Sequence, residues 1–219
     1  MPGFVNEHRP YGPYERWVKR PLDAVLAGAA LVALSPVMAA TALAVRVKLG
    51  SPVIFRQPRP GLNEEVFELY KFRTMTDERG TDGELLPDEE RLTKFGAWLR
   101  STSLDELPEL VNIVKGDMAV VGPRPLLVRY LDRYTPEQRR RHEVRPGLTS
   151  LAMSLVRNGS GWDKKFELDI EYVDNVSFLM DLQVVLKTVL IVIRREGINE
   201  PGYSTNSEVL GTTALGDAK

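Results

Sequence analysis

The chain has 219 residues, of which 43% are hydrophobic, and a formal net charge of −1, which suits one globular domain and argues against a second. It has no cysteine and two histidines, which excludes disulfides and thiolate metal sites and argues against zinc, so any metal should be a hard ion such as Mg²⁺ on carboxylates. The balanced charge and the lack of a recognisable nucleic-acid motif argue for no nucleic acid among the partners.

Residues 22–48 form an almost unbroken apolar run, and about 20 such residues span the hydrocarbon core of a bilayer. Residues 1–21 are a basic lead-in, in which we expect Lys19 and Arg20 at the membrane interface. Further cations follow the run, and cations at both ends favour the return of both ends to the cytoplasmic face. Ser35 and Pro36 lie at its middle, where proline bends a helix and serine can bond a freed carbonyl. We therefore expect a re-entrant helix-break-helix segment.

Other readings of this apolar run stay open. It could be an ordinary kinked helix that crosses the membrane once, or a helix buried in a protein core. A cleaved signal peptide fits less well, because the run is long for the apolar region of such a peptide and no convincing cleavage site follows it.

Residues 49–196 are predicted to form a small cytoplasmic domain, so the expected fold class is α+β and mainly helical. Residues 53–55 and 66–73 have the composition of two strands joined across a turn at 60–63, which predicts a β-hairpin with Lys71 and Arg73 on one face. An acidic loop over 77–90 precedes an amphipathic helix over 88–100. A short helix over 108–115 follows, with proline at its start and Gly116 past its end.

Thr135 to Gln138 has the pattern of a capping box that begins a helix bearing Arg139, Arg140 and Arg141. This basic cluster is expected either to meet anionic lipid or to form a solvated helix face. Further helices are predicted over 163–173 and 178–195, the second apolar around most of its circumference. The polar tail over 197–219 is expected to lack regular structure.

Asp105 and Glu106 are adjacent carboxylates at the entrance to the helix predicted over 108–115. The positive end of a helix favours anions, which would help to keep Asp105 ionised, and an ionised aspartate can attack phosphorus to form an acyl phosphate. The competing interpretation is purely structural, because Ser103 and Glu106 also have the spacing of a capping box.

Phosphate chemistry also needs cations, and Lys71, Arg73, Arg100 and Arg124 lie at marked positions of the sequence. Arg124 follows Gly122 and Pro123 in a tight loop, and the planar fork of arginine suits bidentate phosphate binding. Each of these cations could also be an ordinary solvated side chain.

The chain resembles the bacterial sugar transferase family, the small monotopic phosphoglycosyl transferases, over roughly residues 17–195. The resemblance rests on short runs that occur in family order: residues 19–23, Ser35-Pro36, 57–61, 70–75, 104–108, 115–118, 121–125, 145–149 and Arg157-Asn158. One stretch departs from the family pattern, because Met153 stands where glutamine is usual and Leu155-Val156 stand where Asn-Gly is usual. These apolar replacements motivate an alternative reading, a catalytically impaired homologue that acts as a membrane scaffold for later glycosyltransferases.

The resemblance implies a transferase on the cytoplasmic face of the bacterial inner membrane that moves a phosphosugar from a UDP-sugar to polyprenyl (undecaprenyl) phosphate and releases UMP, the first membrane step of glycoconjugate and polysaccharide biosynthesis. It implies a ping-pong mechanism in which Asp105 is the nucleophile, with Mg²⁺ held by Asp105 and Glu106. Glu106 would alternatively assist the incoming lipid phosphate. The residues implied in phosphate, nucleotide or supporting contacts are Lys71, Arg73, Arg100, Arg124, Arg157 and Asp169. A bitopic enzyme with the same chemistry and an external N-terminus is the other topological possibility.

Overall fold

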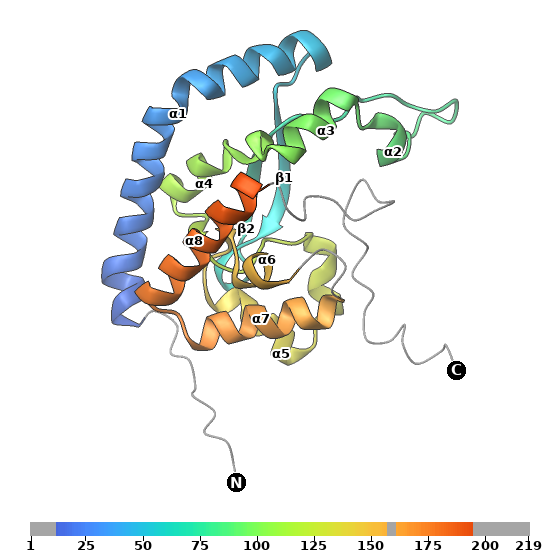
Figure 1. The fold of residues 1–219 in the computed structure, drawn as a ribbon. Coiled ribbons are helices and arrows are strands. Elements are labelled where there is room, and N and C mark those ends of the chain that lie inside the picture. The colour runs from blue at the N-terminus through green and yellow to red at the C-terminus, as the bar shows by residue number, and fades with distance from the viewer. Residues whose placement is uncertain (1–11, 157–160, 195–219) are drawn as a thin grey trace, which may run out of the picture.

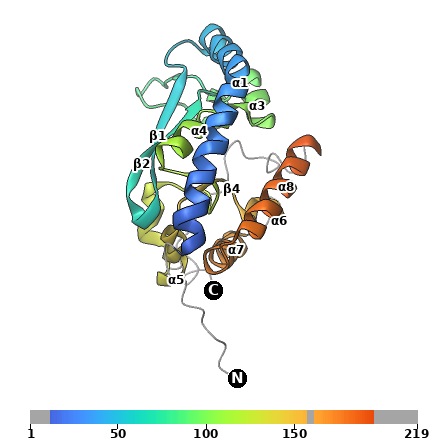
Figure 2. The same ribbon diagram turned by 90° about the vertical axis from the view of Figure 1, so that its left-hand side faces the viewer.

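The computed structural model describes residues 12–156 and 161–194, which are mostly helical with a small β part. A long apolar helix, α1 (Arg20–Leu49), runs along one side of the molecule (Figure 1). Turned by 90°, the same fold shows the hairpin of β1 (Ile54–Pro60) and β2 (Val66–Phe72) on one side of α1 and helices α7 (Trp162–Asp174) and α8 (Phe178–Arg194) on the other (Figure 2). Helix α4 (Glu109–Lys115) packs between α1 and the hairpin.

Helix α1 bends without being interrupted. A π-helical turn over Tyr14–Lys19 leads into it, Gly50 ends it, and its axis changes direction part-way along (Figure 1). Pro36 lies inside the helix, where it can donate no backbone hydrogen bond, and the hydroxyl of Ser35 donates to the carbonyl of Val32 at 2.8 Å. The sequence predicted a helix-break-helix at these residues; the expected break is wrong, because one helix continues through Pro36, and the re-entrant path through a membrane stays a prediction.

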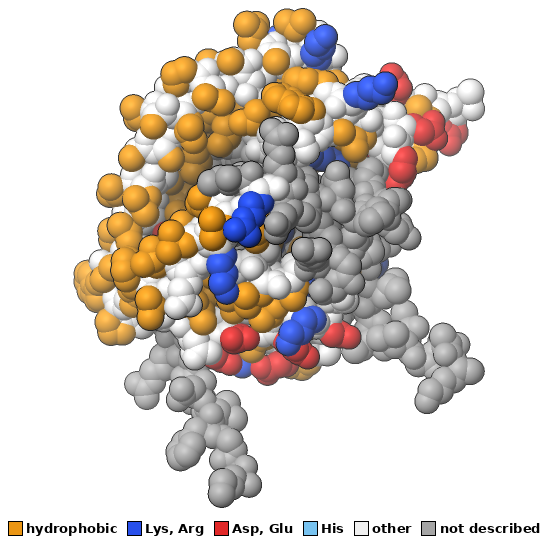
Figure 3. All heavy atoms as spheres, viewed as in Figure 1, with side chains coloured by type: hydrophobic (Ala, Val, Ile, Leu, Met, Phe, Trp, Pro, Cys, Tyr) orange, Lys and Arg blue, Asp and Glu red, His pale blue; other side chains and the backbone are white. Residues whose placement is uncertain are grey.

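One side of α1 packs on the protein and the other is exposed. Ala27 packs with Leu110 and Ile113 of α4, whereas Val32 and Leu43 are largely exposed. Over Tyr14–Leu49 the helical stretch is long and apolar enough to cross a membrane, and only 11% of its most apolar window is buried in the protein. That low burial excludes the reading as a buried core helix. Hydrophobic side chains cover α1 and continue onto α8 on the same face (Figure 3).

The predicted hairpin is confirmed, and α4 is tied to it. Strands β1 and β2 are antiparallel, with Phe55 opposite Lys71 and Arg59 opposite Phe67. The side chain of Asn112, fully buried on α4, donates to the carbonyl of Glu68 at 2.7 Å and accepts from the N–H of Tyr70 at 3.1 Å. Two hydrogen bonds to one strand fix how far α4 stands from the hairpin, which matters because the carboxylate pair directly precedes α4.

The single helix predicted over 88–100 is wrong, because the structure divides it into α2 (Asp88–Arg91) and α3 (Lys94–Ser101). Leu92 adopts an extended conformation and pairs with Met75, and the hydroxyl of Thr93 then caps α3 by accepting from the N–H of Gly96 at 3.0 Å. Gly96 also lets α3 approach the backbone closely, since a Cβ there would lie 1.8 Å from the carbonyl oxygen of Thr74.

The second half of the described chain contains a parallel strand pair that the sequence did not indicate, β3 (Ala119–Val121) with β4 (Gly147–Thr149). Helices α7 and α8 were predicted and are confirmed, as is the capping box that begins α5 (Pro136–Arg139). Helix α6 (Leu151–Leu155) precedes the residues 157–160, which lie outside the described part. Short 3₁₀ turns lie over Leu62–Glu64, Leu104–Glu106, Val128–Arg133 and Arg140–Glu143. The core here packs Val121 against Tyr172, Val173 and Val184.

Candidate active site

The carboxylate pair sits on the 3₁₀ turn Leu104–Glu106, which connects α3 to α4. Ser103 precedes the turn in the left-handed region, with φ 55°, and its side chain caps no helix. Glu106 turns instead toward the hairpin and the loop after β3. The capping box that the spacing of Ser103 and Glu106 allowed is therefore not formed.

Glu106 is the most tightly held carboxylate of the site. Its Oε1 accepts a hydrogen bond from Nζ of Lys71 at 2.7 Å and another from Nη2 of Arg124. These two cations outweigh the cost of burial and lower the pKa of Glu106 far below its usual range, so the group stays ionised. Glu106 thereby fixes a lysine and an arginine from two distant parts of the chain beside Asp105.

Asp105 is buried and differs from its neighbour in its contacts, since its carboxylate accepts no hydrogen bond from the residues that the structure describes. Burial and the negative charge of Glu106 raise its pKa, while Lys71, Arg100 and Arg124 oppose that rise. The positive end of the helix was expected to keep Asp105 ionised, but the cost of burial is larger and the pKa of Asp105 is raised. The carboxylate of Asp105 therefore lies among cations, and its oxygens accept no hydrogen bond from residues 12–156 or 161–194.

Glu109 is a third carboxylate of this site, which sequence analysis missed. It lies at the first position of α4, is almost fully buried, and places Oε1 3.1 Å from Nζ of Lys71. Burial raises the pKa of Glu109 to about 7, and the charge of Glu106 adds to the rise. Little in the sequence singled out Glu109, because acidic residues are common in the first turn of a helix.

Arg100 comes from the last turn of α3 and is steered by the close packing of that helix. Its Nε donates to the hydroxyl of Thr74 at 3.1 Å, next to the backbone against which Gly96 packs. Burial lowers the pKa of Arg100 and the charge of Asp105 opposes this, which places the guanidinium in the field of the candidate nucleophile.

The loop that carries Arg124 is held in place by contacts with the backbone of Arg145 and the side chain of Arg141. A Cβ on Gly122 would lie 2.2 Å from the carbonyl oxygen of Arg145, so only glycine allows these backbones to meet. Nη2 of Arg141 donates to the carbonyl of Arg124 at 2.8 Å, and the same guanidinium pairs with Asp169 at 2.7 Å. Asp169 therefore supports Arg124 through Arg141 and lies behind the site.

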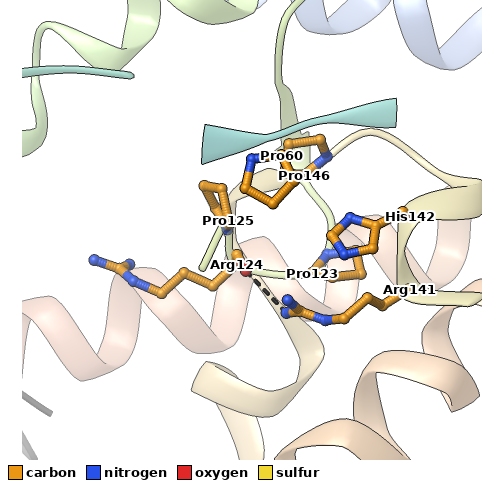
Figure 4. A pocket seen from close by; sticks show the side chains of 7 residues that line it. All are labelled: Pro60, Pro123, Arg124, Pro125, Arg141, His142 and Pro146. Atoms are coloured by element: carbon orange, nitrogen blue, oxygen red, sulfur yellow. Dashed lines mark hydrogen bonds between the residues drawn. The ribbon is translucent and has the colours of Figure 1, made fainter. Parts of the chain in front are cut away.

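Figure 4 shows this back wall, a small pocket in which the side chain of Arg124 points away from the other labelled residues. The lining residues are Pro60, Pro123, Arg124, Pro125, Arg141, His142 and Pro146. Neither Asp105 nor Glu106 lines it. Pro123 and Pro125 flank Arg124 and stiffen its loop, and we assign the pocket no ligand.

Two residues that were predicted to contact substrate, Arg73 and Arg157, are not brought to the carboxylate pair among the described residues. Arg73 donates to the carbonyls of Met75 and Ser51 and pairs with Asp77, so it braces the end of the hairpin. Arg157 lies outside the described residues.

Lys19 and Arg20 are engaged by the protein. Lys19 is buried and pairs with Asp181 of α8 at 2.7 Å and with Asp23 at 3.3 Å. Arg20 donates to the carbonyls of Ile113 and Val114, at 2.8 and 2.9 Å, and so caps the C-terminal end of α4. The place of both residues at a membrane surface stays a prediction.

The basic cluster over 139–141 is also engaged by the protein. Arg139 pairs with Glu64, Arg140 pairs with Asp174, and Arg141 is buried with its carboxylate partner. These pairs leave less charge for anionic lipid than the sequence pattern allowed.

The donor set of the site suits a hard cation only in part. No group of three potential metal ligands occurs among the described residues. Mg²⁺ is commonly bound by one or two carboxylates, with substrate phosphates and water completing its shell. The carboxylate of Asp105 meets that description, while Glu106 already carries two cations.

Comparison with known proteins gives matches along most of the chain. The family model described as bacterial sugar transferase matches residues 14–195. An uncharacterized sugar transferase, EpsL of Bacillus subtilis, is 51% identical over 195 residues, covering 89% of this chain and 96% of the relative. A UDP-glucose:undecaprenyl-phosphate glucose-1-phosphate transferase of Caulobacter vibrioides is 39% identical, covering 83% of this chain and 73% of the relative.

A relative named for a different sugar matches as well. The UDP-N-acetylgalactosamine-undecaprenyl-phosphate N-acetylgalactosaminephosphotransferase of Aeromonas hydrophila is 34% identical over 194 residues. The match covers 83% of this chain and 45% of that relative. The Caulobacter and Aeromonas relatives thus differ in the sugar in their names, and both names contain undecaprenyl phosphate.

Proposed function

This chain belongs to the bacterial sugar transferase family and is a transferase, and we propose that it moves a phosphosugar from a UDP-sugar to polyprenyl phosphate with release of UMP. The observation that carries this proposal is the buried carboxylate of Asp105, unbonded within the described protein and placed in the field of Lys71, Arg100 and Arg124. An anionic nucleophile surrounded by cations is what attack on an anionic diphosphate requires.

In the proposed ping-pong mechanism, an oxygen of Asp105 attacks the phosphorus that bears the sugar. The new bond is an aspartyl phosphodiester, and the bond to the second phosphate breaks with its electron pair, so that UMP leaves. An oxygen of polyprenyl phosphate then attacks the same phosphorus and displaces the carboxylate of Asp105. Lys71 and Arg124 counter the charge that develops on the phosphoryl oxygens, and Glu106 keeps both cations in place.

Mg²⁺ is part of this proposal. Bound through Asp105 and the diphosphate of the donor, it would neutralise charge on the departing nucleotide. Because Glu106 is held by Lys71 and Arg124, we favour Asp105 over Glu106 as the protein ligand.

The apolar surface of α1 supports membrane association, and we propose that α1 enters and leaves by the cytoplasmic face of the bacterial inner membrane. Both ends of the helix are basic, and Pro36 lies within it. This path would hold Asp105 at the depth of the lipid phosphate, so that proximity replaces a search through water. Later glycosyltransferases of the same pathway would take the product.

The test is a screen for UMP release. The purified protein is supplied with polyprenyl phosphate, Mg²⁺ and a panel of UDP-sugars, and intact mass is measured with donor alone. We expect one donor to yield UMP and a protein adduct of one phosphosugar. Asp105→Asn should lose both signals, whereas Asp82→Asn, in the exposed loop, should keep both. Lipid product formed without any adduct, or by Asp105→Asn, would refute the covalent mechanism.

The same screen decides the scaffold alternative. That alternative draws on Met153 and Leu155, which are both exposed on α6, and the thioether sulfur of Met153 lies 3.3 Å from Nη1 of Arg124. A protein that binds membrane yet releases UMP from no UDP-sugar would favour the scaffold role.

A further inference from the structure

Arg59 is a cation of the hairpin that forms no ion pair with a carboxylate in the described part of the chain. Its Nη2 donates to the neutral side chain of Gln57 at 2.6 Å, and its Nε is buried without a hydrogen-bond partner in the described part of the chain. Among residues 12–156 and 161–194, no carboxylate lies within ion-pairing distance of its guanidinium. A guanidinium has five N–H donors, so the hydrogen bond to Gln57 leaves donors of Arg59 available for a ligand.

Its neighbours make the imbalance greater. Burial, and next the positive charge of Arg124, lower the pKa of Arg59 to about 10, so the group still carries its charge at neutral pH. Glu109 opposes this shift from a distance, but it is paired with Lys71. Around the site, the cations outnumber the carboxylates. The cations are Arg59, Lys71, Arg100 and Arg124, and the carboxylates are Asp105, Glu106 and Glu109.

The register of the hairpin places Arg59 on the same face as Lys71. Residues directly opposite in an antiparallel pair share a face, and Lys71 is opposite Phe55, four positions before Arg59. At about 3.3 Å per residue, the two backbone positions lie roughly 13 Å apart along the strands. Arg124 reaches into this region from the loop after β3. It donates a hydrogen bond to Glu106, and its positive charge lowers the pKa of Arg59.

We propose that Arg59 and Arg124 form a phosphate-binding subsite beside the carboxylate pair, where Arg59 holds a phosphate of one of the two substrates. This proposal rests on the proposed function, which supplies two phosphate-bearing substrates. The free enzyme holds two arginines that repel each other, and an anion bound between them replaces that repulsion with charge-assisted hydrogen bonds. The planar fork of Arg59 suits two oxygens of one phosphate.

The test compares Arg59→Gln and Arg59→Lys with Arg56→Gln as a matched control. Arg56 lies on the opposite face of the same strand, is largely exposed, and pairs with Glu68 at 3.5 Å. Binding of inorganic pyrophosphate and of UMP is measured by the shift of the thermal unfolding midpoint, which needs no turnover. The Michaelis constants of the UDP-sugar and of polyprenyl phosphate are measured separately.

Arg59→Gln should weaken pyrophosphate binding, and raise the Michaelis constant of one substrate, by about 10- to 100-fold, the usual worth of hydrogen bonds to a charged group. A rise for the UDP-sugar assigns the subsite to the donor, and a rise for polyprenyl phosphate assigns it to the acceptor. The unfolding midpoint of the ligand-free variant should stay unchanged or rise, because a half-buried cation that forms no ion pair in the described part of the chain is removed. Arg59→Lys should recover part of the affinity, and Arg56→Gln should behave as wild type.

Unchanged pyrophosphate and UMP affinity in Arg59→Gln, together with unchanged Michaelis constants, would overturn the subsite. So would a fall in the ligand-free midpoint that accounts for the lost activity, since Arg59 would then be structural. A wild-type enzyme that turns over no UDP-sugar would refute the proposed function. The pyrophosphate titration would still decide the subsite.

Discussion

Nζ of Lys71 lies 3.1 Å from Oε1 of Glu109, an acid that is 2% exposed and whose pKa is raised to about 7. Between the unfolded pKa near 4.3 and pH 7, the folded protein therefore keeps a proton that the unfolded chain releases. The resulting stability is present at the acid end of this window and is lost as the pH rises through 7.

Glu109→Gln should remove that dependence. Near pH 5 the variant and the wild type should unfold at similar temperatures, whereas at pH 8 the variant should be more stable by on the order of 2 kcal/mol. Thermal unfolding across pH 5–8 measures this, with Glu84→Gln in the exposed loop as control. A constant difference between Glu109→Gln and wild type at all pH values would contradict the raised pKa.

Asp105→Asn should have opposite effects on activity and on stability. Burial and the charge of Glu106 raise the pKa of Asp105, so an uncharged side chain of the same shape relieves a cost in the ligand-free protein. We expect turnover to disappear and the unfolding midpoint at pH 7 to rise by a few degrees. A variant that is inactive and also less stable would show that the carboxylate is needed for the fold.

Breaking the ion pair behind the site should be costly. Arg141 and Asp169 are 3% and 4% exposed, so Arg141→Met leaves a buried carboxylate without its partner. Such losses amount to about 3–5 kcal/mol, which lowers the midpoint of a chain of this size by about 10 °C or more. The double variant Arg141→Met, Asp169→Leu should regain most of that stability but less of the activity, because the carbonyl of Arg124 stays unsupported. Equal midpoints for the single and double variants would contradict this account.

The path of α1 can be tested by labelling, because the chain has no native cysteine. Val5→Cys reports the segment before the helix, and Glu84→Cys reports the domain after it. A membrane-impermeant maleimide should label both positions in inside-out vesicles and neither in right-side-out vesicles. Labelling of Val5→Cys from the outside alone would establish a helix that crosses the membrane once.

Local chemistry explains which elements were predictable. The hairpin, α4 with Gly116 past its end, and the capping box of Thr135 depend on neighbouring residues and were found from the sequence. The division between α2 and α3 was not, because Leu92 leaves the helix to pair with Met75, a contact that the periodicity does not encode. Strands β3 and β4 are too short to carry an alternating pattern.

The residue types of the candidate site could be predicted from the sequence, whereas the contacts between those residues were less predictable. Lys71 and Arg124 contact Glu106, and Arg100 lies in the field of Asp105, while the substrate roles that the resemblance implied for these cations stay predictions. It assigns Arg73 to backbone carbonyls, which sequence spacing cannot distinguish from a substrate contact. Glu109 was hidden for a related reason, because its burial depends on how α4 meets the hairpin.

The contact between Lys19 and Asp181 joins the start of the apolar helix to the final helix described. Nζ of Lys19 and the hydroxyls of Tyr14 and Tyr172 all converge on this one carboxylate, at 2.7, 2.8 and 2.7 Å. Asp181 therefore links α8 to the start of α1 and to α7. A truncation before Phe178 would remove this shared acceptor and leave Lys19 with Asp23 and Tyr172 with the carbonyl of Val121, so residues 178–194 help to hold the start of α1 on the domain.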